Sequence, residues 1–174
     1  KNNKKLIDHK LPKILYSNFT IDKEFKYIFF IGHDEANRPN TVNIYDTKKK
    51  ETKTIWKISN ISNDVDVYFS SDYTTLFLEI SSYSSNSIYY LKINDLIYDD
   101  LVNNENCKLF KIIFDKLDNI KYDIDKIDNY FVFIKKTPDK ELINFLPFYV
   151  NIDEIEKKDY KYIDIDRLKK KIRY

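Results

Sequence analysis

The residues most able to carry acid–base, nucleophilic or metal chemistry are few in this sequence. It holds two histidines, His9 and His33, and one cysteine, Cys107. A structural zinc site needs Cys or His ligands in paired spacings such as Cys-x-x-Cys, and no such pair occurs. His33 is followed by Asp34, but a histidine beside a carboxylate is more often a loop residue than a catalyst. We therefore predict no metal site, no cofactor and no catalytic residue in this chain.

Carboxylates are numerous, and two pairs have a spacing that could suit a cation. Asp123 with Asp125, and Asp164 with Asp166, would place both side chains on one face of a strand. The residue between the two acids is an isoleucine in both pairs. This alternation favours a polar strand face opposite a buried one, and the glycine-bearing calcium-loop signature is absent. We interpret both pairs as outward-facing strand residues.

The overall charge and composition exclude several classes of function. The 30 Lys and Arg residues nearly balance the 28 Asp and Glu residues. A nucleic-acid partner is not expected, because such proteins normally concentrate excess base on one face. The apolar stretch Tyr27–Ile31 is far shorter than the ~20 residues that cross a bilayer, so no membrane contact is expected. With one cysteine no intramolecular disulfide can form, and a reducing, cytoplasmic compartment fits best.

Aromatic residues supply material for a folded core, whereas glycine is almost missing. The chain has 15 Tyr and 12 Phe, whose rings suit half-buried strands. Glycine occurs once, at Gly32, so tight turns must use Asn or Asp, which also tolerate a positive φ. We expect such turns at Asn63-Asp64, Asn94-Asp95 and Asp128-Asn129.

Three similar units follow one another along the chain. Taking Ile28, Leu76 and Phe131 as equivalent positions, the repeat is about 50 residues long, near the lengths of propeller repeats. Each unit has two strand-like segments around a turn, a third after a loop, and room for a fourth. The segments are 19–22, 27–31, 41–46 and 53–58 in the first unit, 67–72, 75–80, 87–93 and 108–113 in the second, and 121–125, 130–134 and 147–152 in the third.

The pattern within the units favours strands over helices. The second segment of each unit is continuously apolar, as expected when both faces are covered, whereas the third alternates polar and apolar residues, as expected nearer the outside. Only residues 93–101 and 139–145 approach a helical pattern. Four strands per unit describe a propeller blade. The predicted fold class is therefore all-β, a partial β-propeller of about three four-stranded antiparallel blades.

The domain organisation follows from these units. Residues 1–17 are expected to be a lead-in, frayed or disordered over 1–10. Residues 18–174 would form the partial propeller, with units at approximately 18–60, 61–115 and 116–165. The polar, Asn-rich residues 96–106 are expected to be an extended loop between blades. Because Met is absent and the chain begins at Lys1, we expect a segment of a longer protein.

Several stretches in consecutive units resemble a known family. Residues 32–39, Gly-His-Asp-Glu-Ala-Asn-Arg-Pro, follow an apolar strand and precede Val-Asn-Ile-Tyr, as in a blade of oligopeptidase B. The second unit is similar to the next blade through 66–72, the Ser-rich loop within 76–87, and 88–91; the third is similar through 120–125 and 130–134. The resemblance covers most of residues 18–154 in the family's blade order. The third unit lacks the family's usual first-turn His and Gly, and the loop at 96–106 is longer.

The resemblance implies a member of the prolyl oligopeptidase family, in which a seven-bladed propeller covers an α/β-hydrolase domain and admits only short peptides. In oligopeptidase B the cut follows Lys or Arg. With one glycine, this chain cannot contain the Gly-x-Ser-x-Gly elbow that presents the nucleophile. It is expected to be the non-catalytic, substrate-gating segment of a serine endopeptidase, inactive alone. Its partners would be the hydrolase domain, the remaining blades and, in the parent, short peptides; its uncovered faces favour self-association.

Asp34, Glu35, Arg38 and Pro39 carry the resemblance in the first unit. We expect them to be a structural motif, in which Arg38 pairs with one acid and Pro39 fixes the exit of the loop. Shaping the channel, or the face that meets the hydrolase domain, is the functional alternative for these residues. For the whole chain the alternative is a free-standing propeller that binds protein partners. A propeller glycosidase has less support, because no pair of catalytic carboxylates stands out.

Overall fold

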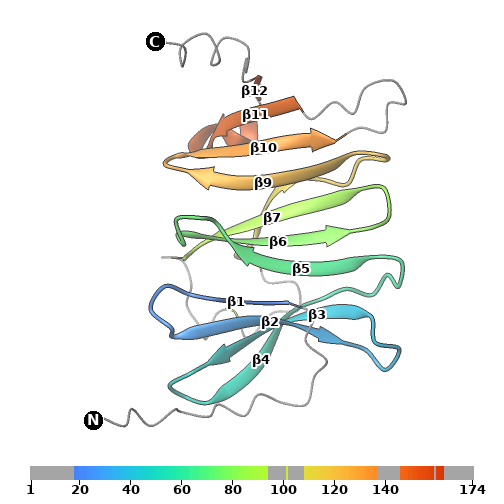
Figure 1. Cartoon of the computed structure of the whole chain (residues 1–174), viewed down its shortest axis with the longest axis vertical. Helices are drawn as coiled ribbons and strands as arrows, with labels where there is room; N and C mark the ends of the chain where they lie inside the picture. Colours follow the sequence, from blue (N-terminus) through green and yellow to red (C-terminus); the bar gives the residue numbers. More distant parts are fainter. Residues whose placement is uncertain (1–17, 94–100, 102–107, 137–145, 159, 163–174) are drawn as a thin grey trace, which may run out of the picture.

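The protein folds into three four-stranded antiparallel sheets, each a meander in chain order (Figure 1). The structure is a computed structural model and describes residues 18–93, 101, 108–136, 146–158 and 160–162. The first sheet contains β1 (Phe19–Ile21), β2 (Tyr27–His33), β3 (Pro39–Asp46) and β4 (Glu51–Lys57). The second contains β5 (Asp64–Phe69), β6 (Thr75–Ser81), β7 (Asn86–Lys92) and β8 (Lys111–Phe114). The third contains β9 (Lys121–Ile127), β10 (Tyr130–Lys136), β11 (Leu146–Asn151) and β12 (Lys161–Tyr162), with the 3-10 helix η2 (Ile152–Lys157) before β12.

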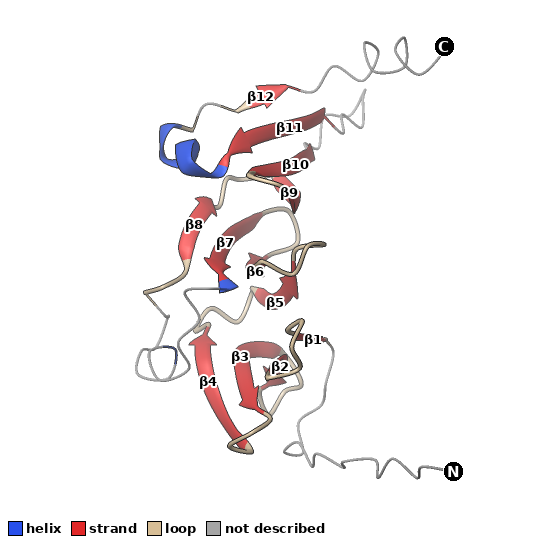
Figure 2. Ribbon diagram, turned by 90° about the vertical axis from the view of Figure 1, so that its left-hand side faces the viewer, coloured by secondary structure: helices blue, strands red, loops and turns tan. Residues whose placement is uncertain are grey.

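The three sheets stack one on another along the long axis of the molecule (Figure 1). The first strands, β1, β5 and β9, lie along one side of the stack, and β4 and β8 lie along the other (Figure 2). Such an order of equivalent strands, from an inner to an outer edge, is that of propeller blades. The predicted fold class, an all-β partial propeller, is confirmed.

Apolar side chains close the seam between the first and second sheets, which we call the first seam. Phe29 and Ile31 of β2 project into this core and are fully buried. Trp56 of β4 packs its ring against Tyr89 and Phe110, with centroids 5.1 and 5.7 Å apart. Because successive side chains of a strand point to opposite faces, one strand of the second sheet can contribute side chains to both seams.

Aromatic rings close the second seam, between the second and third sheets. Phe131 of β10 contacts Phe77 and Tyr90 edge-on, with centroids 5.6 and 5.0 Å apart. Phe114 of β8 stacks on Tyr122 of β9 at 4.1 Å. Edge-to-face and offset pairs of this kind add about 0.5–1.5 kcal/mol each to the energy of burial.

The continuously apolar second strand is confirmed where both faces are covered. In β6, Leu76, Phe77 and Leu78 are all fully buried, because Phe77 faces the third sheet and its neighbours face the first. In β10 the burial alternates instead: Phe131 is buried, whereas Tyr130 is 42% exposed. The outer face of the third sheet is therefore uncovered by the described part of the chain.

The third strand lies next to the outer strand of its sheet, as expected, but some of its polar residues are buried. In β3, Asn43 is 5% exposed, and in β7 Asn86 is 1% exposed. Their amides are tolerated because they are hydrogen-bonded. Thr54 Oγ1 donates to Asn43 Oδ1 at 2.7 Å, and Asn43 Nδ2 donates to Thr41 Oγ1 at 3.2 Å. Alternating polarity in this strand thus marks hydrogen-bonded positions as well as solvent-facing ones.

The turn chemistry agrees with the sequence-based expectation at Asp128, which has a φ of 51°, but not at Asn63-Asp64, neither of which has a positive φ. Asn94-Asp95 lies outside the described residues. In the first hairpins of the first and second sheets the positive φ falls on aromatic residues, Phe25 (57°) and Tyr73 (59°).

Side-chain oxygens explain why these hairpins accept aromatic residues at a positive φ. Asp22 Oδ1 accepts a hydrogen bond from the Tyr27 N–H at 2.7 Å, and Ser70 Oγ accepts one from the Thr75 N–H at 3.0 Å. The two turns therefore have the same six-residue construction in consecutive units. The bond from the first to the last residue offsets the cost of a left-handed residue, which is roughly 1–2 kcal/mol for a non-glycine residue.

Other boundaries differ modestly from the sequence-based expectations. The segment expected at 108–113 forms β8 at Lys111–Phe114, and η2 was not expected. The expected lead-in at 1–17 and the Asn-rich loop at 96–106 lie outside the described residues, apart from Leu101, which is buried in the first seam.

Gly32 occupies a place in β2 that has no room for a side chain. It pairs with Thr41, next to a register shift between Gly32 and His33. A Cβ atom added at Gly32 would lie 2.3 Å from Thr41 Oγ1 and 2.7 Å from Asn43 Nδ2. Close approach between neighbouring strands, rather than turn geometry, requires glycine here.

We predict that Gly32→Ala lowers the free energy of unfolding by about 1–3 kcal/mol, the usual cost of overpacking. Thr41→Ala in the same chain should restore part of the loss, because it removes the nearer clashing atom. Urea denaturation followed by the fluorescence of Trp56, the single tryptophan, measures both changes. Unchanged stability of Gly32→Ala would contradict the close approach of these strands.

Candidate functional site

A hollow of about 760 Å³ is lined by residues of the first hairpin of each sheet. These hairpins turn at the end of the stack that is on the left of Figure 1. The volume of the hollow lies within the range of about 300–1,000 Å³ typical of ligand pockets. Because all three sheets contribute, the hollow exists only in the assembled fold. We call it the turn-face hollow; it is lined by Asp22, Lys23, Glu24, Lys26, Tyr27, Tyr73, Thr74, Thr75, Lys92, Ile93, Lys126, Asp128, Asn129 and Ile152.

The turn-face hollow is lined by both charged and apolar side chains. Four of the lining residues are lysines and three are acids. Lys26 forms an ion pair with Glu24. Ile152, 4% exposed, and the partly buried Ile93 form apolar parts of the wall. The hollow can therefore hold a ligand that combines an apolar body with charge.

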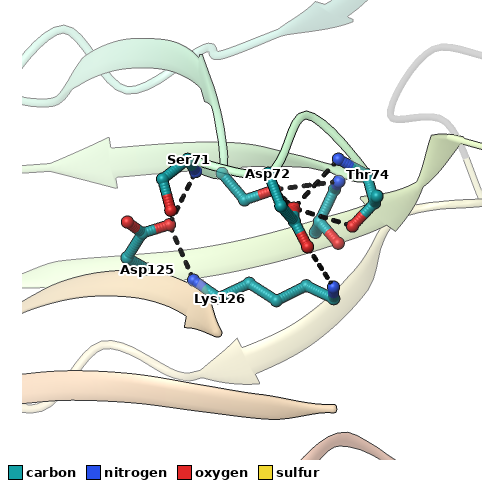
Figure 3. Close-up of polar contacts among 7 residues, drawn as sticks. Ser71, Asp72, Thr74, Asp125 and Lys126 are labelled. Atoms are coloured by element: carbon teal, nitrogen blue, oxygen red, sulfur yellow. Dashed lines mark hydrogen bonds and ion pairs between the residues drawn. The ribbon is translucent and has the colours of Figure 1, made fainter. Parts of the chain in front are cut away.

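Polar contacts join the second and third sheets beside the hollow (Figure 3). Lys126 Nζ, from β9, donates to Asp72 Oδ2 in the β5–β6 turn at 2.5 Å. The Ser71 N–H donates to Asp125 Oδ1 at 2.9 Å, and the Lys126 N–H donates to the same oxygen at 2.7 Å. Two neighbouring residues of β9 thus hold two neighbouring residues of one turn.

Asp72 is the most strongly perturbed carboxylate of this group. Partial burial alone would raise its pKa. Hydrogen bonds from Lys126 Nζ, Ser70 Oγ (2.6 Å) and Thr74 Oγ1 (2.8 Å) outweigh burial and hold the pKa of Asp72 well below its usual value of 3.8. The carboxylate therefore stays ionised and fixes both the turn and the seam.

A second polar connection across the same seam is buried. Asn86 Nδ2 donates to the Tyr122 carbonyl at 2.8 Å, and the Tyr122 N–H donates to Asn86 Oδ1 at 2.8 Å. Asn86 Nδ2 also donates to Glu79 Oε1 at 2.8 Å. Burial raises the pKa of Glu79 despite that hydrogen bond, and burial together with the charge of Glu79 raises the pKa of Tyr68. This group positions β9 against the second sheet.

The predicted motif lies in the β2–β3 connection, at the opposite end of the first sheet from the turn-face hollow. Asp34 Oδ2 accepts from Arg38 Nε at 2.9 Å and pairs with Arg38 Nη2 at 2.7 Å, so both guanidinium nitrogens contact one carboxylate oxygen. Hydrogen bonds from the backbone and side chain of Arg38 lower the pKa of Asp34. Glu35 is exposed, and Pro39 begins β3 opposite His33. The structure thus brings Asp34 and Arg38 together without Glu35.

The remaining sequence candidates form no common site. His33 ends β2, and its Nδ1 is buried without a hydrogen-bond partner among the described residues. Asp123 is exposed and pairs with Lys136, whereas Asp125 bonds to Ser71. Cys107, His9, Asp164 and Asp166 lie outside the described residues. Within the described ranges, no group of three or more His, Cys, Asp or Glu side chains could hold a metal ion.

The turn-face hollow was missed by reasoning from sequence, although one signal pointed to it. Asp22 and Ser70 start turns of equal length at equivalent places in two units, each with an aromatic residue three positions later. Such a repeat marks equivalent hairpin ends, and equivalent ends of stacked sheets converge. Lys92, at the end of β7, also lines the hollow. Nothing in the sequence around it indicates this position.

The similarity between this chain and known proteins is one of fold. Neither a protein-family model nor a curated protein sequence matches the chain. The solved structure of oligopeptidase B from Leishmania major matches with a TM-score of 0.64 and 14% identity, covering 82% of this chain and 19% of that one. Oligopeptidase B from Trypanosoma brucei, in a closed form with covalently bound antipain, matches with a TM-score of 0.61 and 13% identity, covering 78% and 18%.

A prolyl endopeptidase, one of two compared for the role of inter-domain dynamics in catalysis and specificity, also matches. Its TM-score is 0.61 and its identity 16%, covering 85% of this chain and 21% of that one. The chain thus has the fold of part of a prolyl oligopeptidase propeller, and the resemblance to oligopeptidase B is confirmed at the level of fold. It spans only 18–21% of the length of these proteins. No helix in the described ranges is long and apolar enough to cross a membrane.

Asp72 should make stability depend on pH. Its pKa is lower in the folded than in the unfolded chain, so its contribution is complete above the unfolded pKa of about 3.8 and is lost as the pH falls towards the folded pKa. We predict that Asp72→Asn costs about 1 kcal/mol at neutral pH, the order found for partly exposed charged pairs. The difference from the unchanged chain should shrink below about pH 4.

Urea denaturation at several pH values measures this difference. Asp64→Asn, at an exposed position of β5, is the matched control and should leave a small difference that does not vary with pH. A constant gap between the Asp72→Asn chain and the unchanged chain down to strongly acidic pH would contradict the assigned role of the carboxylate.

Proposed function

We propose that this chain is the non-catalytic, substrate-gating propeller segment of a serine endopeptidase of the prolyl oligopeptidase type, similar to oligopeptidase B and acting on short peptides. The observation that carries the proposal is the match over 82% of this chain to 19% of an oligopeptidase B. Three sheets account for only part of such a protein. A hydrolase domain and further blades would supply the missing length.

The gating role is inferred from how the chain could act without catalytic groups. Its single glycine excludes the nucleophile elbow, so any contribution to peptide cleavage must be steric or electrostatic. A stack of sheets is suited to restricting access, because both seams are apolar and polar contacts of Asn86 and Lys126 also cross the second seam. A cytoplasmic location is part of the proposal, since one cysteine permits no intramolecular disulfide.

The test is to sequence the full-length transcript and express its product. We expect a downstream Gly-x-Ser-x-Gly elbow followed by Asp and His, and covalent labelling of that serine by a fluorophosphonate probe. The full-length protein should cleave short peptides after Lys or Arg, and the 174-residue chain alone should neither react nor cleave.

Replacing the elbow serine by alanine in the full-length protein is the control, and it should abolish both labelling and cleavage. Cleavage is then compared for two substrates of the full-length protein, a short peptide and an unfolded protein that contains the same cleavage sequence. Gating predicts that only the short peptide is cut. A full-length product with further blades but no elbow would reject the peptidase proposal and leave a free-standing interaction scaffold.

We also propose that the isolated chain associates with itself through the outer face of the third sheet. Phe131 and Phe133 of β10 face the second seam, so Tyr130, Val132 and Ile134 point away from it. Tyr130 packs on Tyr149 of β11 with ring centroids 5.7 Å apart, and it remains 42% exposed. The same face of the first two sheets is covered by the next sheet, so this face suits a covering partner.

Sedimentation velocity should show dimers or larger species of the 174-residue chain. Val132→Lys with Ile134→Lys should shift the chain towards monomer, because two charges on this face oppose its burial. Ile61→Lys, which changes a loop side chain that is 71% exposed, should not. A monomer at every concentration would contradict this association.

A further inference from the structure

The outer face of the first sheet, which points away from the first seam, is buried at its centre. Because Phe29 and Ile31 face the seam, Phe30 between them points to the outer face, and it is fully buried. Tyr45 of β3 follows the seam residue Ile44, so it also points outward, and it is 4% exposed. Neither ring belongs to the core of either seam.

This burial requires a covering segment. Side chains stand roughly perpendicular to a sheet, so neighbours on the same face leave the outer end of a ring open to solvent. The first sheet is the end of the stack, and no other described sheet lies on its outer face (Figure 1). Phe30 and Tyr45 are nevertheless buried in the single chain. A part of this chain outside the described ranges therefore lies against them.

The cover is narrow. Paired residues of neighbouring strands share a face, so Phe19 of β1 lies beside Phe30, and Thr52 of β4 lies beside Tyr45. Phe19 is 61% exposed, and Thr52 is exposed as well. The two central strands are thus covered and the two edge strands are not, which gives a width of about 10 Å, that of a single chain segment. A packed sheet would cover the edge strands too.

The connections of the chain indicate which segment this is. Residues 1–17 lead directly into β1 of the first sheet. Leu101, the described residue within 94–107, is buried in the first seam, on the opposite face of that sheet. Residues 137–145 and 163–174 are joined to the third sheet, at the other end of the stack. The first seventeen residues therefore start nearest to the covered face.

The composition of residues 1–17 suits an apolar contact. Six of these residues are apolar or aromatic: Leu6, Ile7, Leu11, Ile14, Leu15 and Tyr16. We infer that residues 1–17 dock on the outer face of the first sheet, across β2 and β3, at the place where a preceding blade would pack. Terminal segments that cap a stack of repeats keep an apolar end face away from water in this way. The inference does not depend on the proposed peptidase function.

Photo-cross-linking of the full 174-residue chain tests this docking. p-Benzoylphenylalanine replaces Thr52, an exposed residue at the margin of the covered area and far from residues 1–17 in sequence. Irradiation should join this position to residues 1–17, and tandem mass spectrometry locates the linked residue. A mixture of isotope-labelled and unlabelled chains separates the two possible origins, because a cross-link within one chain never joins a labelled peptide to an unlabelled one.

The matched control places p-benzoylphenylalanine at Tyr130, an exposed aromatic position on the outer face of the third sheet. It should give no cross-link to residues 1–17 of the same chain. Three outcomes at Thr52 would overturn the inference: a cross-link to a second copy, a cross-link to 94–107, 137–145 or 163–174, or no cross-link at all.

Ile14→Asp with Leu15→Asp supplies a second test in the full chain. Neighbouring side chains point in different directions in strands and in helices, so this pair presents at least one aspartate to the sheet in either case. The unfolding equilibrium constant should rise about tenfold or more, because apolar area returns to water. Urea denaturation measures this change, and the cross-link from Thr52 should be lost in the same variant.

Asn2→Asp with Asn3→Asp is the control, since it makes the same change in net charge within residues 1–17. It should leave both the urea midpoint and the cross-link from Thr52 unchanged. If the two aspartate pairs have the same effect on stability, the apolar residues of this segment are not docked and the inference fails.

Discussion

The burial of apolar sheet faces between neighbouring sheets is the interaction on which this structure depends. The strand ladders lie within each sheet, so side chains supply most of the contacts from one sheet to the next. Phe29 meets Phe69 edge-on at 5.7 Å across the first seam, and Phe77 meets Phe131 at 5.6 Å across the second. A sheet in the middle of such a stack must be apolar on both faces. The continuously apolar β6 is therefore a consequence of stacking rather than of strand formation itself.

Apolar burial has little directional preference, so polar contacts set how the second and third sheets are aligned. The amide of Asn86 bonds to both backbone groups of Tyr122 and so fixes the position of β9 against the second sheet. Lys126 and Asp72 repeat this alignment at the turn end of the same seam. A buried amide left without these partners would be costly, which makes a shifted register unfavourable.

The two ends of the stack have different chemistry. At one end the hairpins of three sheets converge on the turn-face hollow, which is lined by lysines, acids and Tyr73. At the other, the β2–β3 connection of the first sheet is fixed by Asp34 and Arg38 within a single turn. Asp34 and Arg38 thus contact each other within one sheet, whereas the hollow is lined by residues of all three. The similarity to oligopeptidase B and prolyl endopeptidase is in the fold, that is, in how the sheets stack.

The sequence alone determined the strands, their grouping into repeated units and the lack of a nucleophile elbow. These are local properties: apolar runs such as 76–80 form strands, turns divide them, and one glycine cannot build the elbow. Only the tertiary structure decided that Asn43 and Asn86 are buried, that Phe25 and Tyr73 adopt a positive φ, and that Lys23 shares a hollow with Lys92. Each depends on partners in another strand, turn or sheet, and spacing along one segment cannot specify how separate sheets align when their apolar faces are buried.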